Sequence, residues 1–260
     1  MKNNISKTHC TVLLTNDAYF NKMLHTLQGI LNFEHNTDIV VIIGDDLKDS
    51  DKLNHPTIRQ NNVIVKYFPD IEFTQEFNNT FNTLKRESTW VQRKFQYHKF
   101  NVFNTFFKQW NFIIYIDSGS TIFNSIDILF NAIRHEKFCA HSDGYPNNPW
   151  VLKGQFDTTN PLFENLNGTY NLEIDYPQTT IMIFDTNIIN ENTVEELHGL
   201  AERWPISITN DQGIISLYFT AIKNIWEQIQ LGDENFWYYD YCIRDSKVDK
   251  PHVIVKCFNT

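Results

Sequence analysis

The sequence predicts an α/β fold in which a mainly parallel sheet is flanked by helices, arranged as a single domain. Apolar runs rich in β-branched residues alternate with segments whose apolar residues recur at helical spacing. The chain has 260 residues, of which 42% are hydrophobic, and no Pro-, Gly- or Ser-rich linker divides it. This length and composition suffice for one large hydrophobic core.

The first three predicted strands follow one another with helical or irregular connections between them. Residues 10–15 form an apolar run, and residues 19–31 then carry apolar residues at helical spacing. Residues 38–43 and 62–67 are two further apolar runs, the first of them followed by Gly44. Strands joined by such crossovers are usually parallel, so these three runs predict a parallel sheet.

The next predicted strand ends in a carboxylate. Residues 89–110 predict a helix, because four aromatic residues fall on one face: Phe100, Phe103, Phe107 and Trp110. An apolar strand over residues 111–116 follows and ends directly at Asp117. Ligands of open α/β sheets bind beyond the carboxyl ends of such strands. A carboxylate beside so many apolar neighbours is costly to bury without a partner, which favours a site residue at Asp117 over a turn former beside Gly119.

The second half of the chain predicts shorter elements. They are a short helix at residues 127–134, strands at 138–140 and 180–185, a polar helix at 190–203, a helix that begins near Asp211, and a final strand at 253–256. Residues 144–177 contain several prolines and glycines and show little periodicity, so they predict a long loop region.

Net charge indicates which binding partners to expect, and cysteine content indicates the cellular compartment of the protein. The formal net charge is −9 and the pI is near 5.4, so we expect no nucleic-acid binding. We also expect no membrane span, because no apolar run reaches the required length of about 18 residues. The four cysteines have no metal-like spacing, which indicates reduced thiols in the cytoplasm or another reducing intracellular compartment.

Four short segments occur in an order that is more informative than any one of them. They are Thr15-Asn16-Asp17-Ala18-Tyr19 after the first strand, Lys99 on the helix before the central strand, Asp117-Ser118-Gly119 at the end of that strand, and Asp211-Gln212-Gly213 at a late helix. In this order the chain resembles the GT-A glycosyltransferases, and in particular the glycogenin-like family eight. The resemblance extends over about residues 9–220.

The resemblance implies transfer of a sugar from a nucleotide-diphosphate sugar, a UDP-sugar, to an acceptor hydroxyl with retention of configuration. It implies that the donor is bound by Thr15, Asn16, Asp17, Tyr19, Lys99, Asp117, Ser118, Gly119 and Asp143. It implies a catalytic set of Asp117, Asp211 and Gln212. The single domain would have a nucleotide-binding half at about residues 9–120 and an acceptor-side half at about residues 121–260. The acceptor would be a glycan or a protein, and an oligomer is one of the expected states.

The chain departs from the family pattern at the diphosphate site. Gly119 stands where the second carboxylate of Asp-x-Asp normally binds a divalent ion, and the late histidine of the family has no clear match, since His252 lies in a different context. The negative charge of the departing diphosphate could then be stabilised in two ways. Asp117 could bind Mn²⁺ or Mg²⁺ weakly, or Lys99 and backbone N–H groups could stabilise the diphosphate without a metal.

Gly119 also leaves a second functional hypothesis open, which is a catalytically silent homologue that binds a nucleotide or a glycan. Several candidate residues have structural alternatives as well. Asp17 and Asp211 could cap helices, and Lys99 could be a solvated helix residue.

Overall fold

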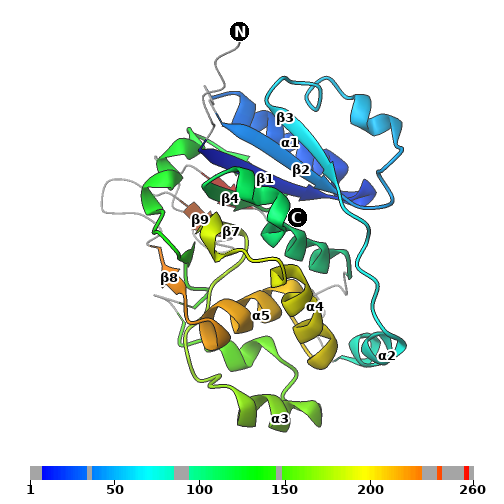
Figure 1. Cartoon of the computed structure of the whole chain (residues 1–260), viewed down its shortest axis with the longest axis vertical. Helices are drawn as coiled ribbons and strands as arrows, with labels where there is room; N and C mark the ends of the chain where they lie inside the picture. The colour runs from blue at the N-terminus through cyan, green and yellow to red at the C-terminus, as the bar shows by residue number, and fades with distance from the viewer. Residues whose placement is uncertain are drawn as a thin grey trace.

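The fold is seen in a computed structural model, which describes residues 8–33, 37–84, 94–144, 148–229, 239–241 and 255–257. Seven strands form one sheet in the order β3-β2-β1-β4-β7-β6-β8 (Figure 1). They are β1 (His9–Thr15), β2 (Asp38–Ile43), β3 (Val63–Tyr67), β4 (Phe112–Ile116), β6 (Phe138–Ala140), β7 (Ile181–Asp185) and β8 (Trp226–Gln228). Only β7 runs antiparallel to its neighbours. The predicted mainly parallel α/β sheet is therefore confirmed.

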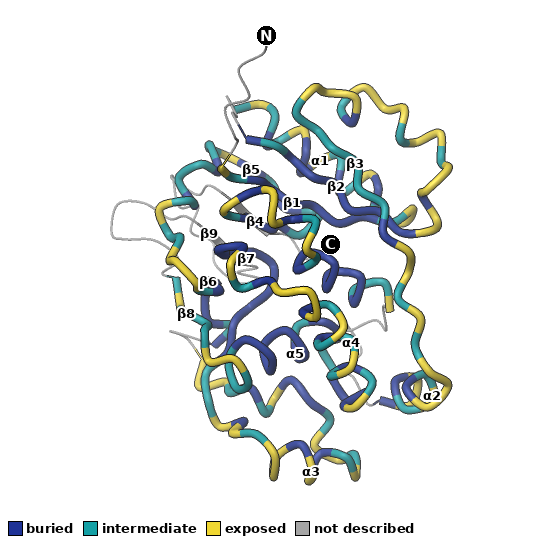
Figure 2. Tube along the Cα trace, viewed as in Figure 1, coloured by how far each residue is buried: buried dark blue, intermediate teal, exposed yellow. Residues whose placement is uncertain are grey.

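Two hydrophobic cores cover opposite faces of this sheet. Side chains alternate along each strand, so Val12 faces one core and Leu13 faces the other. The first core includes buried residues of α2 (Gln75–Thr83), α4 (Thr193–Arg203) and α5 (Asp211–Ser216), and the second includes those of α1 (Phe20–Leu31). Figure 2 shows that the central strands and α5 are buried.

One edge of the sheet collects the ends of several strands. β1, β2 and β4 are parallel, and β6 has the same direction as β4 because β7 between them is antiparallel to both. The segments that follow β1, β4 and β6 lead to Asn16, Asp117 and Asp143. Thr179, just before β7, lies at the same edge because β7 begins there. The sheet topology alone thus brings distant parts of the chain together at this carboxyl edge.

The helix predicted over residues 89–110 is two 3₁₀ helices in the described part of that range, η3 (Lys94–Phe103) and η4 (Thr105–Gln109). Asn104 separates them, and its side chain accepts a hydrogen bond from Phe106 N at 2.9 Å, which starts the second helix anew. The aromatic stripe is buried as predicted: Phe100, Phe103, Phe107 and Trp110. Residues 85–93 lie outside the described residues.

The long loop predicted over residues 144–177 contains two helices, so that prediction was wrong in part. They are η6 (Leu152–Gln155) and α3 (Leu162–Thr169). The Asn160 side chain accepts a hydrogen bond from Leu162 N at 3.0 Å, and Pro161 follows it, which is a typical helix start. Helices this short offer too few apolar positions for periodicity to predict them.

A second, three-stranded sheet lies next to the end of β4. β5 (Ser120–Ile122) pairs with β10 (Val255–Cys257), and β10 pairs with β9 (Tyr239–Tyr241). β10 overlaps the final strand predicted at residues 253–256, whereas β5 was not predicted.

The remaining helices of the described residues are short: η1 (Asp17–Tyr19), η2 (Asp51–Asn54), η5 (Ile126–Ala132), η7 (Thr186–Ile188) and η8 (Leu217–Ile222). Of these, η5 overlaps the short helix predicted at residues 127–134 and is a 3₁₀ helix.

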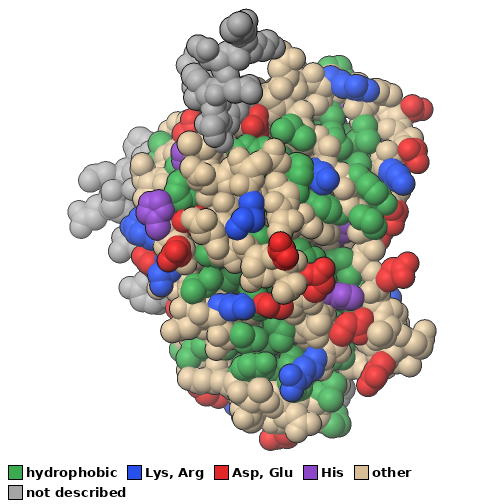
Figure 3. Space-filling model, in the orientation of Figure 1, with side chains coloured by type: hydrophobic (Ala, Val, Ile, Leu, Met, Phe, Trp, Pro, Cys, Tyr) green, Lys and Arg blue, Asp and Glu red, His purple; other side chains and the backbone are tan. Residues whose placement is uncertain are grey.

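The described surface is of mixed charge, and two of the cysteines are buried. No helix in the ranges given above is long and apolar enough to cross a membrane. Acidic and basic side chains are interspersed over the face seen in Figure 3. Cys10 and Cys139 are buried free thiols. Burial raises the pKa of Cys139 to about 11, so this thiol stays protonated and unreactive at neutral pH.

Candidate functional site

The ammonium of Lys99 lies between two carboxylates at the carboxyl edge of the sheet. Lys99 Nζ is 3.0 Å from Asp117 Oδ1 and 3.0 Å from Asp211 Oδ2. η3 carries Lys99, the end of β4 carries Asp117, and α5 begins at Asp211. Lys99 is 5% exposed and Asp211 2%, whereas the Asp117 side chain is 37% exposed. The cluster is therefore open to solvent on its Asp117 side.

The electrostatics of this cluster favour a charged Lys99. Burial lowers the pKa of Lys99, but Asp117 and Asp211 outweigh burial, and the net effect raises this pKa above its ordinary value. Burial raises the pKa of Asp211, and Lys99 opposes that effect. With both carboxylates ionised, one ammonium faces two carboxylates, so the cluster carries one net negative charge.

Tyr115 completes the environment of Asp117. Its hydroxyl donates to Asp117 Oδ1 at 2.6 Å. Burial, together with Asp117, raises the pKa of Tyr115 well above its ordinary value, so the hydroxyl remains a donor. Both Tyr115 and Lys99 bind the same oxygen of Asp117. The other oxygen, Oδ2, is therefore the one that can accept a hydrogen bond from a ligand.

A second network joins Gln212 to Asp143. Gln212 Nε2 donates to Asp143 Oδ2 at 3.2 Å and to Gln155 Oε1 at 3.1 Å, and Tyr176 Oη donates to Asp143 Oδ2 at 2.7 Å. Thr179 links this network to the first, because its N–H donates to Gln212 Oε1 at 3.3 Å while its carbonyl oxygen lies 3.5 Å from Lys99 Nζ. Asp143 and Gln212 are half-buried. The two networks thus form one continuous polar site.

Gly213 permits this arrangement. A β-carbon at this position would clash with Ser207 Oγ and would lie 3.3 Å from Gln155 Cβ. The absence of a side chain therefore lets α5 approach η6 closely, which places Gln212 within hydrogen-bond distance of Gln155.

Asp143→Asn is expected to make the protein more stable than the wild type at pH 7. Burial raises the pKa of Asp143, although hydrogen bonds from Tyr176 and Gln212 oppose this. The folded protein therefore binds a proton at this carboxyl more tightly than the unfolded chain, and its ionisation at neutral pH costs stability. Asparagine has no such cost and its amide oxygen can still accept both hydrogen bonds.

Thermal unfolding of both proteins between pH 3 and pH 8 measures the effect. The extra stability of Asp143→Asn should shrink as the pH falls toward the ordinary pKa of an aspartate and disappear below that pKa. A variant that is less stable than the wild type throughout this range would contradict the assignment.

The turn after β4 is bonded to both β1 and α1. Ser118 Oγ donates to Leu14 O at 2.5 Å, and Gly119 N donates to Thr26 Oγ1 at 3.0 Å. Gly119 has a φ of +102°, a conformation that favours glycine. An aspartate at this position, as in Asp-x-Asp, would need a different turn or would be strained.

The segment after β1 forms the start of α1. The Asn16 side chain accepts a hydrogen bond from Tyr19 N at 3.1 Å and caps η1, so the capping role considered for Asp17 belongs to Asn16. The Asp17 carboxylate is instead exposed and pairs with Lys52 Nζ at 2.5 Å. Thr15 is buried and donates to Asn16 O at 3.0 Å. None of these contacts joins the segment directly to Lys99 or Asp211.

The described residues do not fit a divalent ion held by the protein. Gly119 removes the second carboxylate, and Oδ1 of Asp117 already accepts from Lys99 and Tyr115. Among the residues that the structure describes, no group of three His, Cys, Asp or Glu side chains could bind a metal ion. Mg²⁺ and Mn²⁺ prefer several hard oxygen ligands, and Asp117 alone offers one oxygen. His252 lies outside the described residues.

Sequence reasoning missed four residues of this site, and one of them is Thr179, which links the two networks. Tyr115 precedes Asp117 by two positions on one strand and so shares its face, a signal that could have identified it. Gln155 and Tyr176 fall in the segment predicted as a loop, and no local pattern points to them.

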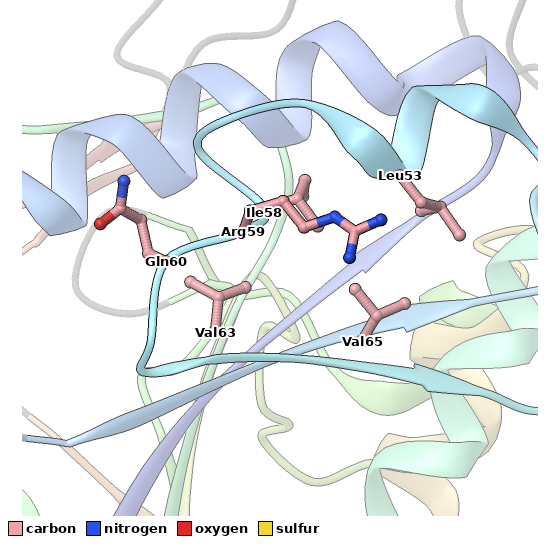
Figure 4. Close-up of a pocket in the computed structure, with 6 residues that line it drawn as sticks. All are labelled: Leu53, Ile58, Arg59, Gln60, Val63 and Val65. Carbon is pink, nitrogen blue, oxygen red and sulfur yellow. The ribbon is translucent and has the colours of Figure 1, made fainter.

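A separate hollow of about 340 Å³ lies beside the edge strand β3 (Figure 4). Its lining is mostly aliphatic: Leu53, Ile58, Arg59, Gln60, Val63 and Val65. None of these residues belongs to the polar site, so the hollow is distinct from it.

Comparison with known proteins places the fold among glycosyltransferases. The chain matches no protein-family model and no curated protein sequence. It is similar to the solved structure of the bifunctional glycosyltransferase WbbM, with 16% identity and a TM-score of 0.54 over 93% of this chain. The chain spans only 41% of the WbbM chain.

Two other solved structures match over most of their own length. The galactosyltransferase LgtC, solved in complex with donor and acceptor sugar analogs, has 9% identity and a TM-score of 0.62, covering 96% of this chain and 86% of LgtC. Mouse xyloside xylosyltransferase 1 has 11% identity and a TM-score of 0.54, covering 96% and 97%. Likeness at these identities shows the fold, and the predicted GT-A-like fold is confirmed.

Proposed function

We propose that the chain is a glycosyltransferase that moves a sugar from a UDP-sugar to the hydroxyl of a glycan or protein acceptor, with retention of configuration. The observation that carries this proposal is the cluster of Lys99, Asp117 and Asp211 at the carboxyl edge of the sheet. Ligands of open α/β sheets bind at this edge. The resemblance to family eight and the GT-A-like fold support the same reading.

The proposed donor site runs along this edge. The uridine end lies against the segment after β1, with Thr15, Asn16, Asp17 and Tyr19 shaping it. The diphosphate lies at the turn of Asp117, Ser118 and Gly119, and the sugar lies toward Asp143 and Gln212. Lys99 lies between Asp117 and Asp211 and fixes the orientation of both carboxylates. The nucleotide half at about residues 9–120 and the acceptor half at about residues 121–260 belong to this proposal.

The burial of Asp211 favours a front-face route over a double displacement. A nucleophile must reach the anomeric carbon, whereas Asp211 is almost fully buried and its Oδ2 faces Lys99. In the front-face route the bond from the anomeric carbon to the diphosphate oxygen breaks, and the acceptor oxygen bonds to the same face of that carbon. The leaving diphosphate takes the proton of the acceptor hydroxyl, so no enzyme nucleophile is needed.

Titration calorimetry with UDP and a panel of UDP-sugars, combined with an assay of released UDP, tests the proposal. We expect UDP to bind the wild type with micromolar affinity, and Asp117→Ala to weaken binding about tenfold or more, because Oδ2 of Asp117 can no longer accept a hydrogen bond from a hydroxyl of the nucleotide. Released UDP with at least one donor and acceptor pair would establish transfer. If no uridine nucleotide binds the wild type, the proposal is wrong.

Gly119 favours a second candidate, a catalytically silent homologue that binds a nucleotide or glycan. Such a protein would bind UDP in the same titration but release none from any UDP-sugar, with or without acceptor. Measurable turnover or slow donor hydrolysis would exclude it.

A further inference from the structure

Hydrogen bonds join Asp143, Gln212, Gln155 and Tyr176 into a closed ring. Gln155 Nε2 donates to Tyr176 Oη at 2.8 Å, and Tyr176 Oη donates to Asp143 Oδ2 at 2.7 Å. Gln212 Nε2 closes the ring, since it donates both to Asp143 Oδ2 and to Gln155 Oε1. Gln155 and Tyr176 are buried, whereas Asp143 and Gln212 are half-buried. The ring therefore has a fixed inner side and an outer side within reach of a ligand.

The backbone of Thr179 fixes the direction of every bond in this ring. Its N–H can only donate, and it faces Gln212 Oε1 at 3.3 Å, so the other end of that amide is the donor. Gln155 must then present its oxygen to Gln212, and this oxygen also accepts from Thr209 Oγ1 at 2.6 Å. Its amide nitrogen is left to donate to Tyr176, whose proton goes to Asp143. The ring thus has one arrangement of donors and acceptors.

This arrangement uses up Gln212 but leaves one oxygen of Asp143. Gln212 Nε2 has two N–H groups, and both are bound within the ring. Both ring bonds to Asp143 end at Oδ2, and Oδ1 accepts no hydrogen bond from the residues that the structure describes. Asp143 lies at the carboxyl edge of the sheet, where β6 ends. Oδ1 is therefore the acceptor that the ring offers to a ligand.

We propose that Asp143 Oδ1 accepts a hydroxyl group of the donor sugar, and that Tyr176, Gln155 and Gln212 are positioning residues that hold this oxygen in place. The inference rests on the proposed function, because it assumes a sugar nucleotide at the carboxyl edge. An oxygen that only accepts selects a sugar with a hydroxyl at the matching position, since a deoxy sugar would leave the carboxylate without a partner. Gln212 then acts on the sugar through Asp143 and not by direct contact.

Calorimetric titration of Asp143→Asn tests the offered acceptor, with UDP, UDP-glucose and UDP-galactose as probes. Tyr176 and Gln212 donate to the position of Oδ2, so the amide oxygen of the asparagine takes that position and its NH₂ group replaces Oδ1. The variant should bind the preferred UDP-sugar about tenfold more weakly, because a charge-assisted hydrogen bond is lost. It should bind UDP like the wild type, because UDP has no sugar to recognise.

Tyr176→Phe tests the positioning role. It should weaken binding of the same UDP-sugar about fivefold and leave UDP binding unchanged, because Oδ2 keeps only the bond from Gln212. Combined with Asp143→Asn it should cause no further loss, since Tyr176 acts through Asp143.

The pH dependence of UDP-sugar binding separates positioning from a merely structural role. The hydrogen bonds from Tyr176 and Gln212 lower the pKa of Asp143, while burial and the charge of Asp175 raise it. Without the Tyr176 hydroxyl this pKa rises, so the carboxylate takes up its proton at a higher pH. Binding of the UDP-sugar should therefore begin to weaken at a higher pH in Tyr176→Phe than in the wild type as the pH is lowered.

Tyr170→Phe is the matched control. Tyr170 is half-buried at the end of α3, in the same segment as Tyr176, and its hydroxyl forms no hydrogen bond with the described part of the chain. This control should bind every probe like the wild type, and thermal unfolding should show that all variants are folded.

The outcomes separate the inference from the function on which it rests. UDP-sugar binding that Asp143→Asn leaves unchanged, or an unshifted pH dependence in Tyr176→Phe, would overturn the inference while UDP binding still supports the proposed function. A wild type that binds UDP but neither UDP-sugar would also overturn the inference alone. A wild type that binds none of the three probes would overturn both.

Discussion

Lys99→Met is expected to lower the free energy of unfolding by about 3–5 kcal/mol at pH 7, the typical cost of removing one partner from a buried ion pair. The methionine fills much of the same space but leaves Asp211, which is 2% exposed, without its cation. Asp117 loses the same partner but is partly exposed, so water can compensate there. Most of the loss should therefore arise from Asp211.

Urea unfolding at pH 5 and pH 7 measures this loss and its origin. Without Lys99, the main opposition to the effect of burial is lost, and the pKa of Asp211 rises further above its value in the unfolded chain. The cost appears when Asp211 must be ionised, so the deficit should be smaller at pH 5 than at pH 7. The double variant Lys99→Met, Asp211→Asn should recover much of the stability. A deficit that is independent of pH and unchanged in the double variant would contradict this account.

Asp211→Asn is expected to lower turnover about 100-fold or more, while stability changes little and UDP binds at least as tightly as it does to the wild type. Asparagine has nearly the same shape, and Lys99 keeps Asp117 as its partner, so no buried charge is left alone. The cluster, however, loses its net negative charge. In the proposed reaction positive charge develops on the sugar ring as the diphosphate leaves, and fixed charges that stabilise it are worth about 10²–10³ in rate.

A single-turnover assay with the donor identified by calorimetry separates turnover from binding. Asp185→Asn is the matched control, because Asp185 is equally buried and lies at the other end of β7, where it caps η7. That variant should lose stability but keep its rate per folded molecule. A normal rate in Asp211→Asn would show that Asp211 serves the fold and not the reaction.

The sequence predicted the central strands well because their signal is local. Residues 39–43 are all β-branched and follow Asp38, and β2 has the predicted bounds, Asp38–Ile43. Asp117 and Asp211 were proposed as site residues from their order along the chain, and the structure brings both to Lys99. Their roles in binding and catalysis stay predictions.

The helices around the site were harder to predict because their form depends on side-chain hydrogen bonds. Asn104 divides one predicted helix into η3 and η4, although the aromatic periodicity continues through it. Gln155 and Tyr176 become site residues only through contacts with Gln212 and Asp143, which are far from them in sequence.

The pairing of β5 with β10 has a consequence for how the site is completed during synthesis. Chains emerge from the ribosome with the amino end first, and early segments can fold before later ones exist. Ser120–Ile122 directly follows the turn at Asp117, yet its partner, Val255–Cys257, is made much later. The backbone next to the turn can therefore form this pairing only after a distant segment of the chain has been synthesised. A chain shortened before Val255 would lack the pairing beside the turn, although the missing residues lie far from Asp117 along the sequence.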